Sequence, residues 1–218
     1  MAESSKLYWQ TNKIIDISPV ISAKTAVFPG DTPFEADFLL KINKGHNIDL
    51  STIKTTVHIG AHTDAPSHYH ASGVTMDQRK LHYYLGPAQV IEVNVKKGAR
   101  IYPKDLTQDV KAPRILFKTN SFPDPNNWSS DFNSLSRELI EELAHKKVIL
   151  VGIDTPSVDP ETDKVLESHT AIFKNDMAIL EGIVLNQVTS GFYDLVCLPL
   201  KIEGADASPV RAILLKHE

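Results

Sequence analysis

The amino-acid sequence predicts a single α/β domain, and three observations lead to that prediction. Residues 136–145 have the apolar stripe of an amphipathic helix, and residues 147–153 follow at once as a continuous apolar run typical of a buried strand. A helix joined directly to a buried strand is characteristic of α/β folds. The 218 residues are 42% hydrophobic and 23% charged, which is enough to bury a sizeable core, and no repeat or linker divides them. We therefore expect residues 1–218 to form one domain.

The remaining strands are predicted from β-branched content, alternation and bounding turn residues. Residues 88–95 alternate apolar with polar side chains, which predicts a strand with one apolar face. Glycine and asparagine in residues 43–47 predict a turn between two paired strands, the second of which leads into a histidine-rich segment. Besides 147–153, the predicted strands are 14–17, 36–42, 50–57, 88–95, 115–118, 193–200 and 210–216.

Two helices and three loops complete the prediction. Ser136 can cap the first helix, and the basic residues at 145–147 suit its negative carboxyl end. Residues 165–173 can form a second, shorter helix. The prolines of residues 28–33 and 154–160 predict irregular loops, and residues 121–133 predict an exposed excursion.

Composition excludes several classes of protein. A net charge of −4 and a pI near 6.1 give no sign of nucleic-acid binding. The longest strongly apolar run, residues 148–153, is far shorter than the roughly 20 residues of a membrane span. Residues 1–10 lack the apolar region of a secretory signal, so we expect a cytoplasmic protein. Cys197 has no second cysteine to pair with and is expected to be a small buried hydrophobe.

Residues 58–70 contain four of the nine histidines and an aspartate, in the pattern H-x-G-x-H-x-D-x-P. Imidazole and carboxylate are good ligands for first-row metals, so this density predicts a bound cation. In an unbroken strand the Cα atoms of His58 and His62 would lie about 13 Å apart, too far for easy shared coordination. A bend at Gly60 would bring the rings together, and Asp64 would project to the same side as His62. We therefore predict that His58, His62 and Asp64 form one ligand set on a bent strand end.

Two other interpretations of this segment are weaker. The histidines could simply lie in a polar surface loop, which is the usual situation for a single histidine but not for four. A helix with histidines four residues apart is opposed by Gly60 and Pro66, and it lacks the glutamate of an H-E-x-x-H motif. Further along, His169 among apolar residues would ordinarily be a core residue. Glu181 interrupts an apolar run, which is rare unless the carboxylate is paired or metal-bound.

The histidine pattern resembles the signature of the metal-dependent cyclase/hydrolase family, which includes bacterial kynurenine formamidases and isatin hydrolases. The resemblance extends to D-I-S at residues 16–18, F-P-G-D-T-P at 28–33, G-I-D-T-P-S-V-D at 152–159 and I-E-G-A-D-A-S-P-V-R at 202–211. It covers nearly the whole chain. It implies a swivelling β/β/α fold with a central mixed, partly barrel-like sheet and peripheral helices, and it implies a homodimer or larger assembly.

The resemblance also implies roles for individual residues. One metal ion would be held by His58, His62 and Asp64 and a second by His169, with Asp64 and Glu181 bridging the pair. Zinc is the expected metal and manganese the alternative. Phe28 stands where the family usually has tryptophan as a wall of the substrate pocket. Phenylalanine keeps the stacking face but loses the indole N–H. From the sequence alone, Phe28 could equally be a loop residue tucked into the core.

The reaction implied by the resemblance is hydrolysis of a small aromatic amide, N-formyl-L-kynurenine, to L-kynurenine and formate in tryptophan degradation. Metal-bound hydroxide would attack the formyl carbon, and His68 would be the catalytic proton shuttle. His68 could instead only orient its neighbours, and His70 has no match in the family. Two alternatives stay open, opening of a cyclic amide as in isatin hydrolases and metal binding without catalysis. The sequence contains neither G-x-G-x-x-G, a motif of dinucleotide-binding oxidoreductases, nor G-x-S-x-G, a motif of serine hydrolases.

Overall fold

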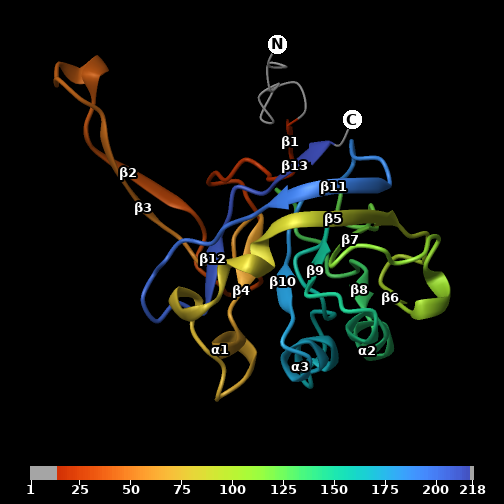
Figure 1. Ribbon diagram of the computed structural model, residues 1–218. Coiled ribbons are helices and arrows are strands. Elements are labelled where there is room, and N and C mark those ends of the chain that lie inside the picture. Colours follow the sequence, from red (N-terminus) through yellow and green to blue (C-terminus); the bar gives the residue numbers. More distant parts are fainter. Residues whose placement is uncertain (1–13, 217–218) are drawn as a thin grey trace, which may run out of the picture.

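A computed structural model describes residues 14–216, which are built around one curled, seven-stranded mixed sheet (Figure 1). Residues 1–10, used above to predict location, lie outside this range. The β5, β7, β9 and β10 strands run parallel, whereas β1, β13, β11 and β5 are joined by antiparallel pairs. Side by side, the strands are β1 (Ile14–Asp16), β13 (Ile213–Lys216), β11 (Gly191–Val196), β5 (Leu85–Glu92), β7 (Arg114–Lys118), β9 (Leu150–Ile153) and β10 (Ala178–Leu180). The predicted α/β class and mixed sheet are thus confirmed.

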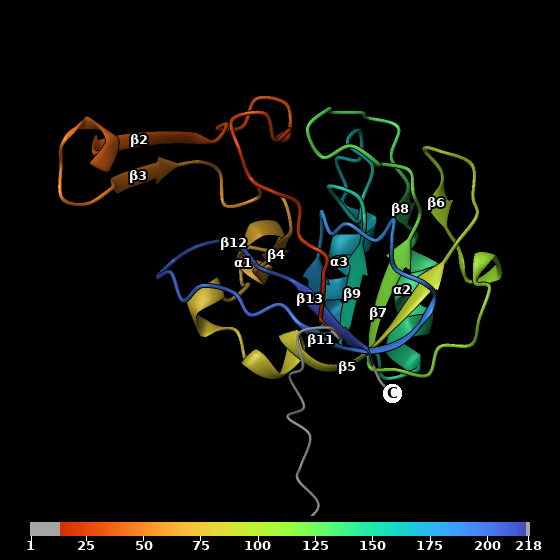
Figure 2. The same cartoon turned by 90° about the horizontal axis from the view of Figure 1, so that it is seen from above.

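Two helices cover one face of the parallel half of the sheet (Figure 2). The first, α2 (Arg137–His145), begins as predicted, because the Ser136 side chain accepts a hydrogen bond from the Leu139 backbone N–H. The second, α3 (Glu167–Lys174), lies beside α2. None of the helices in residues 14–216 is long and apolar enough to cross a membrane.

Hydrophobic cores lie on both faces of the sheet, which corrects the prediction for residues 88–95. In β5, Val90 packs into the core that also contains Leu116, whereas the adjacent Ile91 packs into the core beneath α2. The strand therefore has two buried faces in its middle. The reason is its central place between β11 and β7, which sequence alternation alone does not reveal.

Short elements surround the sheet. The strands β4 (His62–Asp64) and β12 (Ala207–Pro209) form an antiparallel pair, and β6 (Arg100–Ile101) and β8 (Ser134–Leu135) form a parallel pair. One turn of α-helix, α1 (Pro66–Tyr69), follows β4. The 3₁₀ turns are η2 (Ile42–Lys44), η3 (Met76–Gln78), η4 (Leu81–Tyr84) and η5 (Pro103–Asp105).

A two-stranded hairpin projects from the body of the molecule (Figures 1 and 2). It consists of β2 (Glu35–Leu40) and β3 (Leu50–Lys54), and nearly all of its residues are exposed. The two strands pair as predicted. However, β3 ends at Lys54 instead of residue 57, so the strand does not lead directly into the histidine motif. Residues 55–61 leave the hairpin as irregular chain, and β4 begins only at His62.

Candidate metal centre and substrate cavity

The backbone bends at Gly60, as the spacing of the histidines predicted. Gly60 has a φ of 57°, and a Cβ there would lie 3.1 Å from Cγ1 of Ile21, so glycine suits the position on two grounds. His58 therefore precedes the bend in irregular chain, whereas His62 and Asp64 follow it in β4 and are buried. The predicted ligand set is brought together across a bend rather than along one strand.

A backbone bridge brings Glu181 beside this segment, which the sequence could not establish. The N–H of His62 donates to the carbonyl of Glu181 at 3.1 Å, and the N–H of Glu181 donates to the carbonyl of His62 at 2.9 Å. Glu181 follows β10 at the edge of the sheet, so this pairing joins β4 to the main sheet. The side chains of the two residues then meet, with Nε2 of His62 3.2 Å from Oε2 of Glu181.

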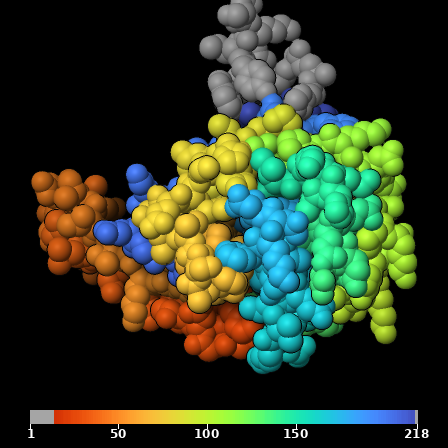
Figure 3. Space-filling model, turned by 60° about the horizontal axis from the view of Figure 1, so that its bottom comes forward, coloured from red at the N-terminus to blue at the C-terminus, as the bar shows by residue number. Residues whose placement is uncertain are grey.

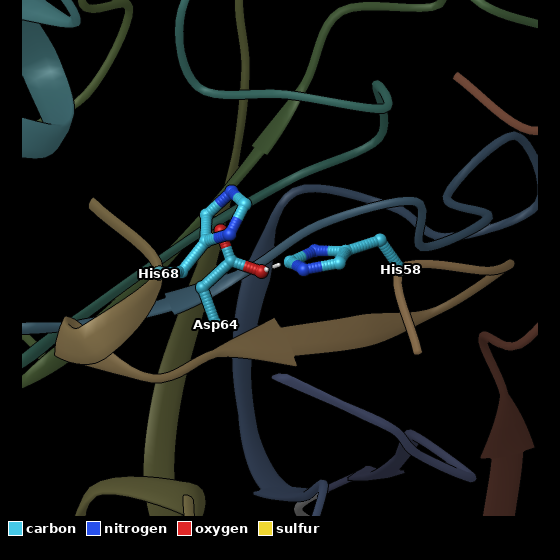
Figure 4. A group of neighbouring side chains, drawn as sticks. All are labelled: His58, Asp64 and His68. Carbon is cyan, nitrogen blue, oxygen red and sulfur yellow. Dashed lines mark ion pairs between the residues drawn. The ribbon is translucent and has the colours of Figure 1, made fainter. Parts of the chain in front are cut away.

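Asp64 lies at the centre of the cluster (Figure 4). Its Oδ1 atom lies 3.0 Å from Nδ1 of His58 and 3.6 Å from Nε2 of His62. Its other oxygen, Oδ2, lies 3.5 Å from Nε2 of His169, which α3 supplies. Nε2 of His169 is also 4.0 Å from Oε1 of Glu181. All five predicted ligands therefore converge, and the two oxygens of Asp64 face different histidines.

The donor set fits a metal ion. Oδ1 of Asp64 is buried and accepts no hydrogen bond of suitable geometry, although histidine nitrogens surround it. Two ligands bound tetrahedrally to zinc at about 2.0–2.2 Å would lie about 3.3–3.6 Å apart. The observed separations of 3.0–4.0 Å bracket that distance. A buried carboxylate oxygen without a hydrogen bond, surrounded by histidine nitrogens at this spacing, is better explained by a shared cation than by direct contacts among the side chains.

Each of the three histidines has a separate acceptor for the ring nitrogen that faces away from the cluster. Nε2 of His58 lies 3.1 Å from Oδ2 of Asp206, and Nδ1 of His62 lies 3.0 Å from the carbonyl of Gly60. Nδ1 of His169 lies 2.7 Å from Oδ2 of Asp159. Metal-binding histidines usually have such outer acceptors, which fix ring orientation and leave the other nitrogen free to coordinate.

The charges of the cluster shift its acid–base equilibria strongly. Burial disfavours the charged form of His58, yet Asp64 and Asp206 raise its pKa to about 9. Burial likewise opposes ionisation of His169, but hydrogen bonds to Asp159 and Asp64 raise its pKa to about 10. Burial favours the protonated form of Asp64, but the neighbouring rings of His169 and His58 hold its pKa well below the usual range. Without metal, protons on the histidines balance the carboxylates, and a bound cation would displace them.

His68 lies in α1, next to His58 and Asp64 (Figure 4), on the more exposed side of the cluster. Its ring centroid lies 4.2 Å from that of His58, and its Nδ1 lies 3.3 Å from Oδ2 of Asp206. Its side chain is 36% exposed, whereas that of His169 is 4% exposed. His68 also has a donor atom within 4.8 Å of donor atoms of both His58 and Asp64. His70 lies apart from this group, stacked on Phe173 with ring centroids 3.7 Å apart.

Asp159 and Asp206 are the site residues to which the sequence analysis gave no role. Both lie in segments that resemble the family, at residues 152–159 and 202–211, so a signal was present. What the sequence did not reveal was their function as acceptors behind His169 and His58. That function depends on contacts across 10 and 148 residues.

A cavity of about 560 Å³ opens over the cluster, with an aromatic wall on one side. Phe28 lines it, and its ring packs edge-on against that of Trp128 with centroids 5.4 Å apart. Trp128 donates its indole N–H to Oε2 of Glu161 at 2.9 Å. The prediction that residues 121–133 form an exposed excursion is therefore wrong in part. The segment is irregular, but its aromatic residues pack together, and Phe132 is 1% exposed.

Three segments that are far apart in the sequence lie side by side on one face of the molecule. Figure 3 shows α3 packed between the segment around α1 and the segment around α2. The centre lies where β4, α3 and the end of β10 meet, and these elements supply His62, Asp64, His169 and the neighbouring Glu181.

Comparison with known proteins supports the family indicated by the histidine motif. A family model described as a putative cyclase matches residues 15–160. Kynurenine formamidases of Bordetella petrii and Bordetella pertussis are each 41% identical over 204 residues, covering 93% of this chain and 97% of the relative.

Solved structures support the same family. That of a potential metal-dependent hydrolase with cyclase activity has a TM-score of 0.81 at 26% identity and covers 94% of this chain and 98% of its own. An isatin hydrolase bound to the product analogue thioisatinate has a TM-score of 0.73 at 18% identity, covering 94% and 93%, and supports the fold alone. The chain therefore belongs to the cyclase family.

Proposed function

We propose that this protein is a metal-dependent amide hydrolase that converts N-formyl-L-kynurenine to L-kynurenine and formate. The observation that carries the proposal is the convergence of His58, His62, Asp64, His169 and Glu181 at the floor of an aromatic-walled cavity. The 41% identity to kynurenine formamidases over 93% of the chain supports the choice of substrate.

The proposed cofactor is a pair of divalent ions, zinc first and manganese as the alternative. His58, His62 and Asp64 would hold one ion and His169 the other, with Asp64 and Glu181 shared between them. The two oxygens of Asp64, which face His58 and His169 respectively, support such sharing. When bound, such ions supply a nucleophile from water at neutral pH and a Lewis acid for a carbonyl group.

The protein's own residues would then bind the substrate and move protons. Phe28 and Trp128 offer aromatic faces to the aryl ring, and the cavity can exclude bulk water from it. Water adds to the formyl carbon, the carbon–nitrogen bond breaks, and the departing aryl nitrogen must take up a proton. His68, at the open side of the cluster, is the proposed donor of that proton. The products are formate and the free arylamine.

Charged side chains at the cavity favour an amino-acid substrate over a neutral cyclic amide. Lys164 lines the cavity and forms no ion pair within residues 14–216, while Glu161 lines it three residues earlier. Opposite charges at one site suit the carboxylate and ammonium groups of a kynurenine-like amino acid. Isatin has neither group, so its hydrolysis is the weaker candidate.

The decisive experiment combines metal analysis with a direct product assay. Purified protein would be depleted of metal, reloaded with zinc or manganese, and assayed for formate release from N-formyl-L-kynurenine and for ring opening of isatin. The proposal predicts metal-dependent formate release as the faster reaction. Preferential isatin opening would support the alternative, and metal binding without turnover of either compound would identify a non-catalytic metal protein.

We also propose a homodimer or larger homo-oligomer, supported by the hairpin of β2 and β3. The register places Ala36, Phe38 and Ile53 on one face, and the side chains of Phe38 and Ile53 remain about half or more exposed, at 49% and 63%. A lone two-stranded hairpin is only marginally stable in water, so a partner for this face is expected. Analytical ultracentrifugation of wild type and Phe38→Asp tests the proposal, which a monomeric wild type would contradict.

A further inference from the structure

Arg100, at the start of β6, contacts the beginning of α3, and its hydrogen bonds connect it through Asp159 to His169. Its side chain is 16% exposed, and its Nη1 donates to Oδ1 of Asp159 at 2.7 Å and to the carbonyl of Leu135 at 2.6 Å. Nη1 also lies 3.2 Å from Oγ of Ser168. Nη2 donates to a carboxylate oxygen of Asp163. One guanidinium group therefore joins two carboxylates and the loop before α3.

Both carboxylates bind the beginning of α3. Asp159 accepts hydrogen bonds from the backbone N–H groups of Ser168 and His169 at 3.0–3.1 Å. Asp163 accepts from the backbone N–H groups of residues 165–167. These N–H groups have no partner within the helix, and the N-cap residue, Leu166, has no side chain that can accept them. The two aspartates thus perform the capping that the local sequence lacks.

The same network holds a strained backbone conformation next to His169. Leu166 has φ 54° and ψ 59°, in the left-handed region that leucine rarely adopts. Such a conformation persists only where surrounding contacts fix it. Asp163 binds the N–H groups on both sides of this residue, and Arg100 holds Asp163 in place.

Asp159 links this network to the ring of His169. Its Oδ2 accepts from Nδ1 of His169 at 2.7 Å, while its Oδ1 accepts from Arg100. The bond at Nδ1 turns Nε2 of His169 toward Asp64 and Glu181. The carboxylates of Asp159 and Asp163 would repel each other without a cation between them, and the forked, permanently charged guanidinium group of Arg100 binds both at once.

We propose that Arg100 is a positioning residue for the metal centre: through Asp159 it fixes the ring of His169 so that Nε2 can coordinate a divalent cation. The inference rests on the proposed function for the identity of the metal site. It concerns the outer contacts of that site, however, and can be measured without turnover.

The test compares Arg100→Gln and Arg100→Lys with wild type, using Arg137→Gln as the matched control. Arg137 is an exposed arginine that pairs with Glu141 on α2, away from the centre. Zinc affinity would be measured by competition with a chelator. The Nδ1–H proton of His169 would be followed by ¹H–¹⁵N spectroscopy in metal-free and zinc-loaded protein, with His169→Ala to assign the signal.

The proposal predicts that Arg100→Gln binds zinc about 10–100-fold more weakly, the usual cost of losing an outer contact of a metal ligand. It also predicts that the slowly exchanging Nδ1–H signal disappears, that Arg100→Lys recovers part of both properties, and that Arg137→Gln matches wild type. Thermal unfolding checks that each variant folds. If Arg100→Gln does not fold, the zinc affinity and the Nδ1–H signal of Arg100→Lys decide the question. Lysine keeps the positive charge but lacks the forked guanidinium group that binds both aspartates.

Unchanged zinc affinity and an intact Nδ1–H signal in a folded Arg100 variant would overturn the proposal. Formate release from N-formyl-L-kynurenine would be measured on the same samples. A wild-type protein that binds zinc and shows the signal but releases no formate would reject the proposed reaction. The comparison of zinc affinities would still decide the role of Arg100.

Discussion

The two sides of the candidate metal centre differ in their access to solvent. On the side of His169 the side chains are buried, with exposed fractions of 4% for His169 and 0% for Asp159. The other side contains His58, and there the side chains of His68 and Asp206 are 36% and 49% exposed. The buried side is suited to holding metal ligands in fixed positions, because its side chains are shielded from water. The open side is suited to admitting substrate and exchanging protons.

Removing the residue shared by both sides should have the largest effect. Asp64→Ala takes away the carboxylate that faces both His58 and His169. We expect loss of tightly bound zinc and a fall in kcat/KM of more than about 10³-fold, equivalent to about 4 kcal/mol. Metal analysis and formate release measure the two effects. Full zinc occupancy in this variant would show that Asp64 is not a ligand.

A change on the open side should affect turnover and leave metal binding intact. His68→Ala is expected to keep wild-type zinc content while kcat falls by about 10²–10⁴-fold, the usual contribution of a general acid or base. The control is His70→Ala, an exposed histidine two residues away that stacks on Phe173. Should His68→Ala lose zinc instead, His68 is a ligand, a role that its proximity to His58 and Asp64 also allows.

A change on the buried side should show the reverse pattern. Asp159→Asn removes the charge behind His169, so zinc affinity should fall by about 10–100-fold while kcat at saturating zinc changes little. Asp131→Asn, which removes the carboxylate from an exposed pair with Lys97, is the control for loss of an aspartate charge. Equal losses of kcat in Asp159→Asn and His68→Ala at saturating zinc would remove the distinction between the two sides.

The smallest expected effect concerns the aromatic wall of the cavity. Trp128→Leu should raise KM for N-formyl-L-kynurenine by roughly 2–12-fold, because an aromatic contact contributes about 0.5–1.5 kcal/mol. Zinc content and kcat should stay near wild type. Phe192→Leu, an exposed phenylalanine on β11, is the matched control. An unchanged KM in Trp128→Leu would mean that the aryl group binds elsewhere.

The sequence predicted the parts of this molecule that depend on neighbouring residues. The helix begins after Ser136, the chain bends at Gly60, and His58, His62 and Asp64 come together, all through local spacing. The resemblance to the family added the role of His169, which no local pattern distinguishes from a core residue. It also specified the role of Glu181, whose place in an apolar run indicated only a paired or metal-bound carboxylate.

What the sequence could not predict depends on contacts between distant segments. The approach of Glu181 rests on a backbone bridge to His62, 119 residues earlier. The second buried face of β5 follows from its place in the middle of the sheet. Trp128 reaches the cavity because aromatic packing folds residues 121–133 inward, although their composition is typical of an exposed loop.

The most direct test of the central claim is a titration of metal-free protein with zinc, in which bound zinc and formate release from N-formyl-L-kynurenine are measured on the same samples. The account predicts no formate release without metal, activity that rises as zinc fills the site, and loss of that activity with a chelator. Equal rates of formate release in metal-free and zinc-loaded protein would contradict it.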